Sequence, residues 1–140
     1  MDPERPDIPP EPVGSYPLVC ETGSLVFLSG VGPRQSGSNE VPGNRYDMDG
    51  RVVSYDMHQQ CHAVFANVRL ILEQNGLRWK DLVDVTVYLT DMKQDFATFN
   101  AIWAEYFPQP GPCRTTVEVG ALPTSIAIEL KCIASKESNR

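Results

Sequence analysis

Apolar residues recur at intervals of three and four between Ser54 and Asn75, and this pattern constrains the fold more than any other part of the sequence. The members of the stripe are Met57, Cys61, Val64, Phe65, Val68, Ile71 and Leu72. This spacing puts all of them on one face of an α-helix, and Gly76 suits the position just after a helix ends. A helix with one apolar face must bury it against another layer, so the pattern predicts a layered domain.

Four further stretches have the composition or the alternation of β-strands. "SLVFLSG" (24–30) is a short apolar run closed by glycine, and apolar and polar residues alternate over residues 83–89. "TTVEV" (115–119) and "SIAIELKCIAS" (125–135) are two more strands, which we expect to form a hairpin across "GALPT". The glycine- and proline-rich segment 30–44 is predicted to be a loop.

A second helix is predicted by the helical spacing of apolar residues between Phe96 and Tyr106, before "PQPGP" ends it. The order of strands, helix, strand, helix and two strands then gives an α+β fold, with one sheet and both helices packed on one face. Two helices cover only one face of a sheet. Because the strands also place apolar side chains on the other face, we expect an oligomer whose sheets meet and whose sites lie between subunits.

The composition restricts the partners and the setting of this domain. The chain has 140 residues, enough for one domain, and its hydrophobic fraction is 41%. We assign residues 13–140 to that domain and residues 1–12, which hold five of the twelve prolines, to an extended or disordered N-terminal arm. The net charge of −6 repels a phosphate backbone, so nucleic acid is not an expected partner, whereas an anionic small molecule is. No apolar run approaches the roughly 20 residues of a membrane span, and the first residues lack a signal-peptide pattern, so we expect a cytoplasmic protein.

The cysteines and histidines predict neither a disulfide nor a metal site. The cysteines are Cys20, Cys61, Cys113 and Cys132. They lie far apart in apolar runs, which is typical of reduced thiols in a core. His58 and His62 have the one-turn spacing of zinc-binding helices, but no glutamate stands beside His58 and no second cluster offers further ligands. We therefore expect surface or packed histidines.

Arg114 and Glu129 are the charged residues whose positions need an explanation. Arg114 stands at the entry to a strand, after a proline-rich turn, and Glu129 lies inside the last strand among apolar neighbours. A carboxylate in such surroundings costs free energy unless it is paired or used. The residues alone leave two alternatives open. One is a structural ion pair or an interface contact, which composition favours slightly, and the other is an active site.

Three segments resemble the Rid (YjgF-like) family of enamine and imine deaminases. "CRTTVEVGALPTSIAIELKCIA" (113–134) is similar to the family's terminal signature, in which an arginine opens the strand, "LP" marks the turn and a glutamate follows fifteen residues later. "VGSYPLVCETGSLVFLSG" (13–30) resembles its N-terminal segment, with Tyr16 and Ser29 at matching positions, and "DFATFNAIWAEYF" (95–107) resembles its second helix. The resemblance implies a chorismate-mutase-like (ferredoxin-like) fold. It also implies a trimer with active sites at subunit interfaces and neither a metal nor an organic cofactor.

Departures from the family pattern point to a specialised member. Val31 stands where a glutamine is usual, and Thr116 replaces a frequent cysteine. "DMKQDF" (91–96) is one residue longer than expected and has Lys93 and Gln94 where an asparagine is expected. "SGVGPRQSG" (29–37) and the proline-rich arm look most like the 2-aminomuconate deaminases. That likeness implies a hydrolase that converts 2-aminomuconate, an enamine, into 2-oxo-3-hexenedioate and ammonia. A general 2-imino acid deaminase and a non-catalytic module that binds keto acids remain as alternatives, and an RNA-directed role conflicts with the acidic charge balance.

The resemblance also implies a role for each matching residue. Arg114 would hold the substrate carboxylate through two parallel hydrogen bonds. Glu129 would orient the water and move protons, and Tyr16 would exchange a proton with the amine side. Thr116 would supply a hydrogen bond where other members have a thiol, and Ser29 matches the serine of the family's Ser-Gly turn.

A dicarboxylate substrate would require a second cation at the far end of the site. Arg34, Arg45 and Lys93 are the candidates. We favour Arg34 because it is five residues from Ser29, which is at most ~18 Å of chain and within reach of a six-carbon substrate.

Overall fold

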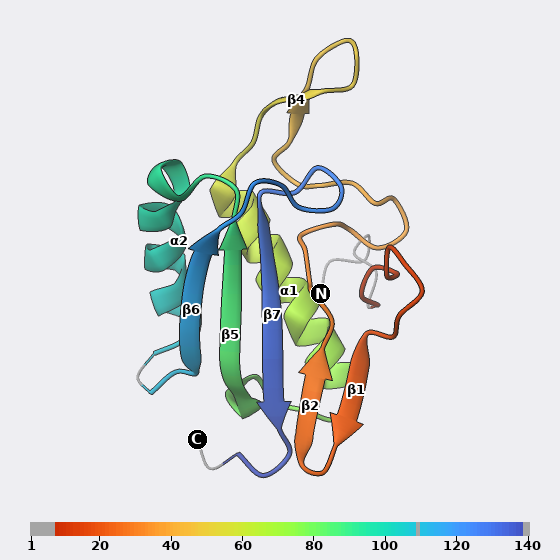
Figure 1. Cartoon of the computed structure of the whole chain (residues 1–140), viewed down its shortest axis with the longest axis vertical. Helices are drawn as coiled ribbons and strands as arrows, with labels where there is room; N and C mark the ends of the chain where they lie inside the picture. The colour runs from red at the N-terminus through yellow and green to blue at the C-terminus, as the bar shows by residue number, and fades with distance from the viewer. Residues whose placement is uncertain (1–7, 109, 139–140) are drawn as a thin grey trace.

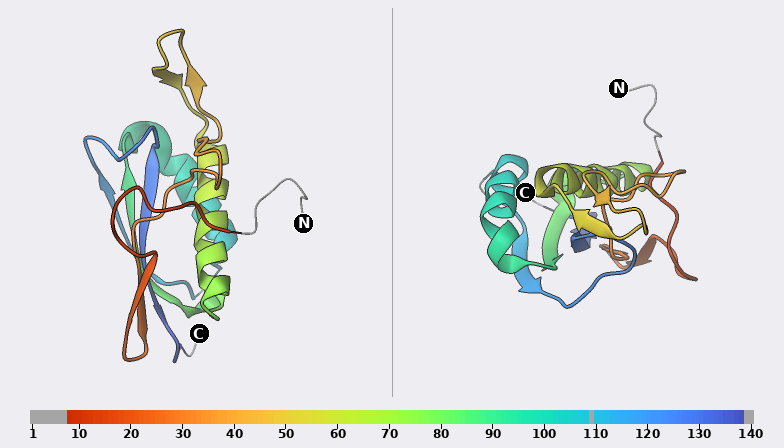
Figure 2. Two further views of the ribbon diagram at one scale, coloured as in Figure 1. Left: turned by 90° about the vertical axis from the view of Figure 1, so that its right-hand side faces the viewer. Right: turned by 90° about the horizontal axis from the view of Figure 1, so that it is seen from above.

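The computed structural model describes residues 8–108 and 110–138. Its elements in chain order are β1 (Val19–Thr22), β2 (Leu25–Leu28), β3 (Arg45–Tyr46), β4 (Val52–Ser54), α1 (Met57–Gln74), a 3-10 turn (Trp79–Asp81), β5 (Leu82–Leu89), α2 (Met92–Tyr106), β6 (Cys113–Glu118) and β7 (Ile128–Ser135). Both helices lie on one face of a five-stranded sheet, as Figures 1 and 2 show. The predicted α+β class is therefore confirmed.

The five strands of the sheet are arranged in the order β1-β2-β7-β5-β6. β5 and β6 run parallel to each other, and every other neighbouring pair is antiparallel. β7 is the last strand in the sequence and the central strand of the sheet. It joins the N-terminal β1–β2 hairpin to the unit formed by β5, α2 and β6 (Figure 1).

The predicted hairpin between residues 115–119 and 125–135 is wrong, because β5 lies between β6 and β7. α2 carries the chain from the end of β5 back to its beginning, and this kind of crossover makes β6 parallel to β5. β7 then pairs with the other edge of β5, with Tyr88 opposite Glu129. Alternation in a sequence identifies strands but leaves their neighbours undetermined.

The core lies between the sheet and the helices. Every member of the apolar stripe of α1 is buried, and so are alternate residues of β7 from Ile128 to Ala134. The helix ends follow their local sequence. The side chain of Asp56 accepts a hydrogen bond from the backbone of Gln59 at the start of α1, and Gly76 follows its end with φ of +71°.

The cysteines divide between the core and the surface. Cys61 and Cys132 are buried, and burial raises the pKa of each thiol to about 12. Cys20 and Cys113 are exposed, so the expectation of four core thiols is wrong for these two. The reason is the direction of their side chains. Cys20 pairs with Phe27, whose neighbours Val26 and Leu28 lie under the helices, so both side chains point to the opposite face.

The face of the sheet opposite the helices carries a mixed set of partly exposed side chains. No helix in the described ranges lies on it (Figure 2). Leu25 and Val117, at 37% and 36% exposure, lie on this face, together with half-buried Phe27, Tyr88 and Ile133. The oligomer expected from this uncovered face stays a prediction.

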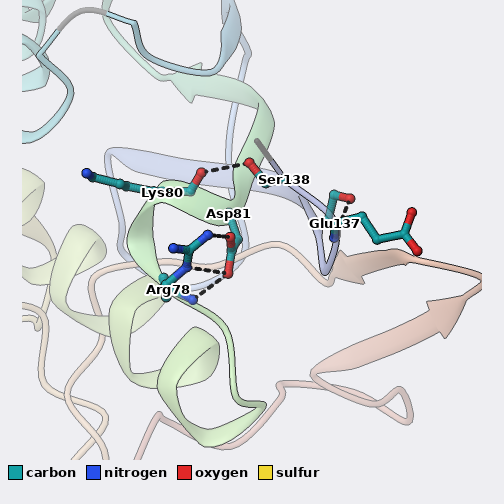
Figure 3. A network of polar contacts seen from close by, with 6 residues as sticks. Arg78, Lys80, Asp81, Glu137 and Ser138 are labelled. Atoms are coloured by element: carbon teal, nitrogen blue, oxygen red, sulfur yellow. Dashed lines mark hydrogen bonds and ion pairs between the residues drawn. The ribbon is translucent and has the colours of Figure 1, made fainter. Parts of the chain in front are cut away.

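Polar contacts fix the 3-10 turn and the segment that follows β7. Arg78 binds the buried carboxylate of Asp81 through its backbone N–H at 2.8 Å and its guanidinium at 2.9 Å. The Ser138 hydroxyl donates to the Lys80 carbonyl at 3.2 Å, so the segment after β7 is tied to the 3-10 turn (Figure 3). Of the proposed N-terminal arm, residues 1–7 lie outside the described residues, whereas the following Pro9 and Pro10 are buried. None of the helices described is long and apolar enough to span a membrane.

Candidate active site

Glu129 lies on β7 and points away from the helices. Its neighbours Ile128 and Leu130 are buried beneath the helices, so strand alternation directs Glu129 to the uncovered face. The side chain is half-buried, and this burial raises the pKa of its carboxyl group. Within the described part of the chain, no hydrogen bond or ion pair reaches that carboxyl group. A desolvated carboxyl group with a raised pKa is suited to accept and return a proton.

Gly30 provides the space that the Glu129 carboxyl group occupies. A Cβ atom added to Gly30 would lie only 2.9 Å from the carboxyl carbon of Glu129. Beside it, the Ser29 hydroxyl donates to the Pro17 carbonyl at 2.7 Å, and the Ser29 N–H donates to the Leu18 carbonyl at 2.9 Å. Ser29 therefore fixes the segment that carries Tyr16 against the end of β2.

Tyr16 reaches the same region from the N-terminal segment. Its side chain is 43% exposed, and together with Gly30 and Arg34 it lines a hollow of about 30 Å³. That volume is roughly the share of one water molecule in the liquid. The hollow could thus hold a water but no organic acid. We call Tyr16, Ser29, Gly30 and Glu129 the glutamate cluster.

Arg114 lies on the edge strand β6 and points toward α2. It pairs with Val85, which is fully buried under the helices. Its guanidinium carbon is 5.0 Å from the centre of the Trp103 ring, 5.3 Å from that of Phe99 and 5.9 Å from that of Phe96. Partial burial lowers the pKa of the guanidinium. No carboxylate or carbonyl of residues 8–108 or 110–138 accepts a hydrogen bond from it, so it is placed to bind an anion from outside the chain.

Thr116 lies two residues after Arg114 on the same side of β6. It pairs with Val87, and its hydroxyl oxygen is buried without a hydrogen-bond partner in the described structure. An unmade hydrogen bond of this kind costs about 1–3 kcal/mol. A ligand held by Arg114 could supply the missing partner. We call Arg114 and Thr116, with the rings of Phe96, Phe99 and Trp103, the arginine cluster.

The two clusters lie on opposite faces of the sheet. The glutamate cluster is on the uncovered face, and the arginine cluster is on the face beneath the helices. The structure thus places Gly30 between Glu129 and the hollow lined by Tyr16, with Ser29 holding the Tyr16 segment, and it places Arg114 and Thr116 side by side on β6, but it separates the two groups. A substrate that needs both Arg114 and Glu129 cannot reach them in one chain across the sheet.

The candidate cations for a second carboxylate differ in their surroundings. The guanidinium of Arg34 donates to the Asn39 side chain at 2.7 Å and to the Glu11 carbonyl at 2.8 Å, so it already has two acceptors. Arg45 lies in β3, on the ribbon that extends from the domain (Figure 1). Lys93 is exposed on α2 three residues before Phe96, and such residues are neighbours on a helix surface. Lys93 therefore neighbours Phe96, which is a member of the arginine cluster.

Sequence reasoning missed Gly30 and the three rings of α2 as parts of the site. The sequence predicts only the start of a loop at Gly30, and the contact of Gly30 with Glu129 depends on the pairing of β2 with β7. Phe96, Phe99 and Trp103 were assigned to the core because their spacing is helical. Their position opposite an arginine depends on β6 lying beside α2. His62, weighed as a metal ligand, lies with its Nδ1 atom 2.6 Å from the Tyr106 hydroxyl.

A mixed sheet covered on one face by two helices, with an unpaired arginine on its edge strand, defines a protein of the chorismate-mutase-like class. Residues 8–136 match the family model described as Endoribonuclease L-PSP, and the chain therefore belongs to this YjgF-like, or Rid, family. The match extends over all the strands and both helices.

The chain is similar in sequence to proteins of several organisms. A RutC family protein of Pyrococcus horikoshii is 37% identical over 91% of this chain and 92% of its own length. Reactive Intermediate Deaminase A, chloroplastic, of Arabidopsis thaliana is 36% identical over 90% of this chain and 61% of its own length. A 2-iminobutanoate/2-iminopropanoate deaminase of Dermatophagoides farinae is 27% identical over 89% of this chain and 88% of its own length.

Solved structures share the whole fold. The YjgF gene product of Escherichia coli superposes with a TM-score of 0.78 at 30% identity, over 95% of this chain and 97% of that one. Escherichia coli TdcF with bound serine also gives a TM-score of 0.78, at 29% identity and 94% and 95% coverage.

Proposed function

We propose that the protein is a cofactor-independent hydrolase that deaminates 2-imino acids and their enamine tautomers. The observation that carries this proposal is the partly buried Arg114 beside the buried, unpartnered hydroxyl of Thr116. A planar guanidinium binds a carboxylate through two parallel hydrogen bonds, and every 2-imino acid has such a carboxylate next to its reacting carbon. The names of the Arabidopsis and Dermatophagoides relatives support the same chemistry.

The proposed reaction needs only acid-base groups. With the carboxylate on Arg114, an enamine takes a proton at C3 and loses one from its nitrogen, and so becomes the imine. Water then attacks C2 while Glu129 accepts its proton, and the carbinolamine that forms loses ammonia to leave the 2-oxo acid. Tyr16 donates to, or receives from, the departing nitrogen, and Thr116 hydrogen-bonds the bound acid. Each positioned proton-transfer group of this kind contributes about 10²- to 10⁴-fold to the rate.

The proposed site is complete only where two subunits meet. Arg114 and Glu129 lie on opposite faces of the sheet in one chain, so the arginine cluster of one subunit would face the glutamate cluster of its neighbour. A cyclic trimer satisfies this arrangement, since every subunit can then offer each cluster once. This geometry supports the expected homo-oligomer, and the uncovered face of the sheet provides the surface for it.

Two substrate ranges are compatible with the site. Short 2-imino acids, such as those in the name of the Dermatophagoides relative, need only Arg114, and the relatives' names favour this general range. 2-Aminomuconate carries a second carboxylate and needs a second cation. We place that role on Lys93 ahead of Arg34, because the guanidinium of Arg34 already donates to Asn39 and to the Glu11 carbonyl.

Ammonia release is the direct test of the proposal. The protein would be assayed with 2-iminopropanoate and 2-iminobutanoate generated in situ by an amino-acid oxidase, and separately with 2-aminomuconate. We expect release of ammonia with formation of the 2-oxo acid, at a rate that a chelator leaves unchanged. Binding of 2-oxo acids without turnover of any imine would instead indicate a regulatory module. The net charge of −6 gives no support to a ribonuclease activity, whatever the family's description.

Lys93→Ala and Arg34→Ala separate the two substrate ranges. If Lys93 holds a second carboxylate, Lys93→Ala raises KM for 2-aminomuconate roughly 10-fold or more while KM for 2-iminopropanoate stays the same. Arg34→Ala serves as the comparison, with a smaller effect on either substrate. Equal changes for both substrates in Lys93→Ala would remove Lys93 from the site, and a selective change in Arg34→Ala would restore Arg34 to it.

A further inference from the structure

A second cavity, remote from the glutamate cluster, lies where the end of α2 meets α1 and the 3-10 turn. Its volume is about 420 Å³, within the range of small-molecule sites. Trp79, Tyr106, Phe107 and Pro108 form its apolar walls, and Arg69 lies at its margin. We call it the Trp79 pocket. The proposed deaminase chemistry uses none of these residues.

Ring packing and hydrogen bonds hold the aromatic walls of the Trp79 pocket in place. The rings of Trp79 and Phe107 are stacked, with centres 4.9 Å apart and planes inclined by 16°. The Trp79 indole N–H donates to the Tyr106 carbonyl at 2.9 Å, and the Tyr106 hydroxyl lies 2.6 Å from His62. The ring of Phe65 packs 4.4 Å from that of Tyr106. A pocket with fixed walls loses little conformational entropy when it binds a ligand.

The backbone that carries Trp79 is fixed as well. Arg78 and Asp81 close the 3-10 turn with two short hydrogen bonds, and the Ser138 hydroxyl holds the Lys80 carbonyl (Figure 3). Figure 3 also shows the Lys80 side chain extending away from the Arg78–Asp81 pair. Lys80 lines the Trp79 pocket too.

Arg69 gives the pocket its charge preference. Its guanidinium carbon lies 4.9 Å from the centre of the Trp79 ring, a cation–π distance. No hydrogen bond or ion pair joins Arg69 to any of the residues the structure describes. An arginine beside an aromatic surface therefore offers its N–H groups to an anion at the edge of an apolar cavity.

We propose that the Trp79 pocket binds a planar aromatic carboxylate, with its ring packed within the apolar walls of the pocket and its carboxylate on Arg69. Neutral aromatic molecules lack the ionic contact, and small aliphatic acids lack the stacking surface. Such a ligand would occupy a site separate from Arg114, which is on β6. The two sites are nevertheless joined by packed rings, because Trp103 lies 4.1 Å from Phe107 and 5.0 Å from the Arg114 guanidinium.

Benzoate is a suitable probe, and the two tryptophans of the chain report on it. Their indole N–H signals in a ¹⁵N–¹H correlation spectrum are assigned with Trp103→Phe, which leaves only Trp79. We expect a saturable shift of the Trp79 signal with benzoate. The apparent affinity should be at least roughly 10-fold weaker for neutral benzamide, because a hydrogen bond to a charged group is worth about 1.5–3 kcal/mol.

Two arginine variants separate this pocket from the proposed deaminase site. Arg69→Gln should weaken benzoate binding roughly 10-fold or more, Arg69→Lys should weaken it less, and Arg114→Lys should leave the Trp79 titration unchanged. Absence of a saturable shift, equal affinity for benzamide, or a shift lost in Arg114→Lys but kept in Arg69→Gln would each overturn the proposal. The experiment measures binding alone, so a protein without deaminase activity could still pass it.

Discussion

Arg114 and Glu129 each hold a charge-bearing group away from water with no opposite charge beside it in the described chain. Burial lowers the pKa of the guanidinium and raises that of the carboxyl group. Both shifts disfavour the charged form, so each residue costs free energy in an isolated chain. Residues retained at such a cost are candidates for function.

Arg114→Lys keeps the positive charge but removes the planar arrangement of donors. We expect kcat/KM for imino acids to fall roughly 10- to 100-fold, because one of two charge-assisted hydrogen bonds is lost. The assembly should persist, as judged by light scattering. Arg78→Lys is the matched control, since Arg78 binds Asp81 in the 3-10 turn before β5 and belongs to neither cluster. Ordinary kinetics in Arg114→Lys would end the carboxylate-binding interpretation.

Glu129→Gln should separate stability from activity. Because the folded state raises the pKa of Glu129, it favours the protonated form. The stability that the Glu129 carboxyl group contributes is present below its pKa in the unfolded chain. That stability is lost as the pH rises through its pKa in the folded chain. Glutamine imitates the protonated form. The Tm of the variant should therefore match that of the parent at low pH and exceed it at neutral pH, while deamination falls about 10²- to 10⁴-fold.

Thermal unfolding measured from pH 3 to pH 8 checks the pH dependence of Glu129→Gln. If the variant were less stable than the parent at neutral pH, Glu129 would be engaged in a stabilising ion pair. That result would favour the structural alternative that the sequence leaves open.

At the scale of elements, the junction of β2 with β7 determines where Glu129 can lie. Phe27 pairs with Ile133 and Val31 with Leu130, so one extra residue is accommodated on the β2 side between these pairs. Gly30 lies in this irregular stretch. The geometry of the glutamate cluster thus depends on the extra residue in the backbone between β2 and Val31.

Gly30→Ala and Gly32→Ala form a matched pair that tests this dependence. In Gly30→Ala the new methyl group would meet the Glu129 carboxyl group at 2.9 Å, and in Gly32→Ala it would meet the end of Ile126 at 2.9 Å. Both are ends of side chains that can move, so we expect each Tm to fall by no more than about 4 °C. Only Gly30→Ala should lower kcat/KM, by roughly 10-fold or more, because it displaces Glu129. Equal kinetic losses in the two variants would indicate a general loosening of the fold.

Local sequence patterns predicted the elements of this fold but could not predict their neighbours. The stripe in α1 and the alternation in β5 are periodic signals, and both elements lie within a few residues of their predicted bounds. The expected hairpin between β6 and β7 failed because the crossover through α2 places β5 between them. Strand alternation is the same for either arrangement.

The sequence identifies candidate site residues, but it does not indicate on which face of the sheet each of them lies. Arg114 and Glu129 stand out in the sequence by chemistry and by resemblance. Their position on opposite faces follows from their partners, since Arg114 pairs with Val85 and Glu129 with Tyr88. Under the proposal that subunits share a site, each chain would then carry two half-sites.

At the scale of the whole molecule, mixing two inactive variants tests whether subunits share a site. Arg114→Lys and Glu129→Gln would be refolded together at equal concentration and compared with each refolded alone. In a mixed ring, a site with one intact arginine cluster and one intact glutamate cluster forms in about a quarter of cases. We therefore expect about a quarter of the parent activity from the mixture. Activity no higher than the average of the two variants would mean that each site belongs to one chain.

The central position of β7 also affects how the protein is made. A ribosome synthesises β1, β2, β5 and β6 before the strand that joins them exists, so β2 and β5 each present an unpaired edge from their own synthesis until β7 follows. At 5–20 residues per second, the 99 residues between the end of β2 at Leu28 and the start of β7 at Ile128 take roughly 5 to 20 s. Nascent chains would spend that time open to aggregation or to chaperones, and the sheet would close in a single late step once β7 leaves the ribosome.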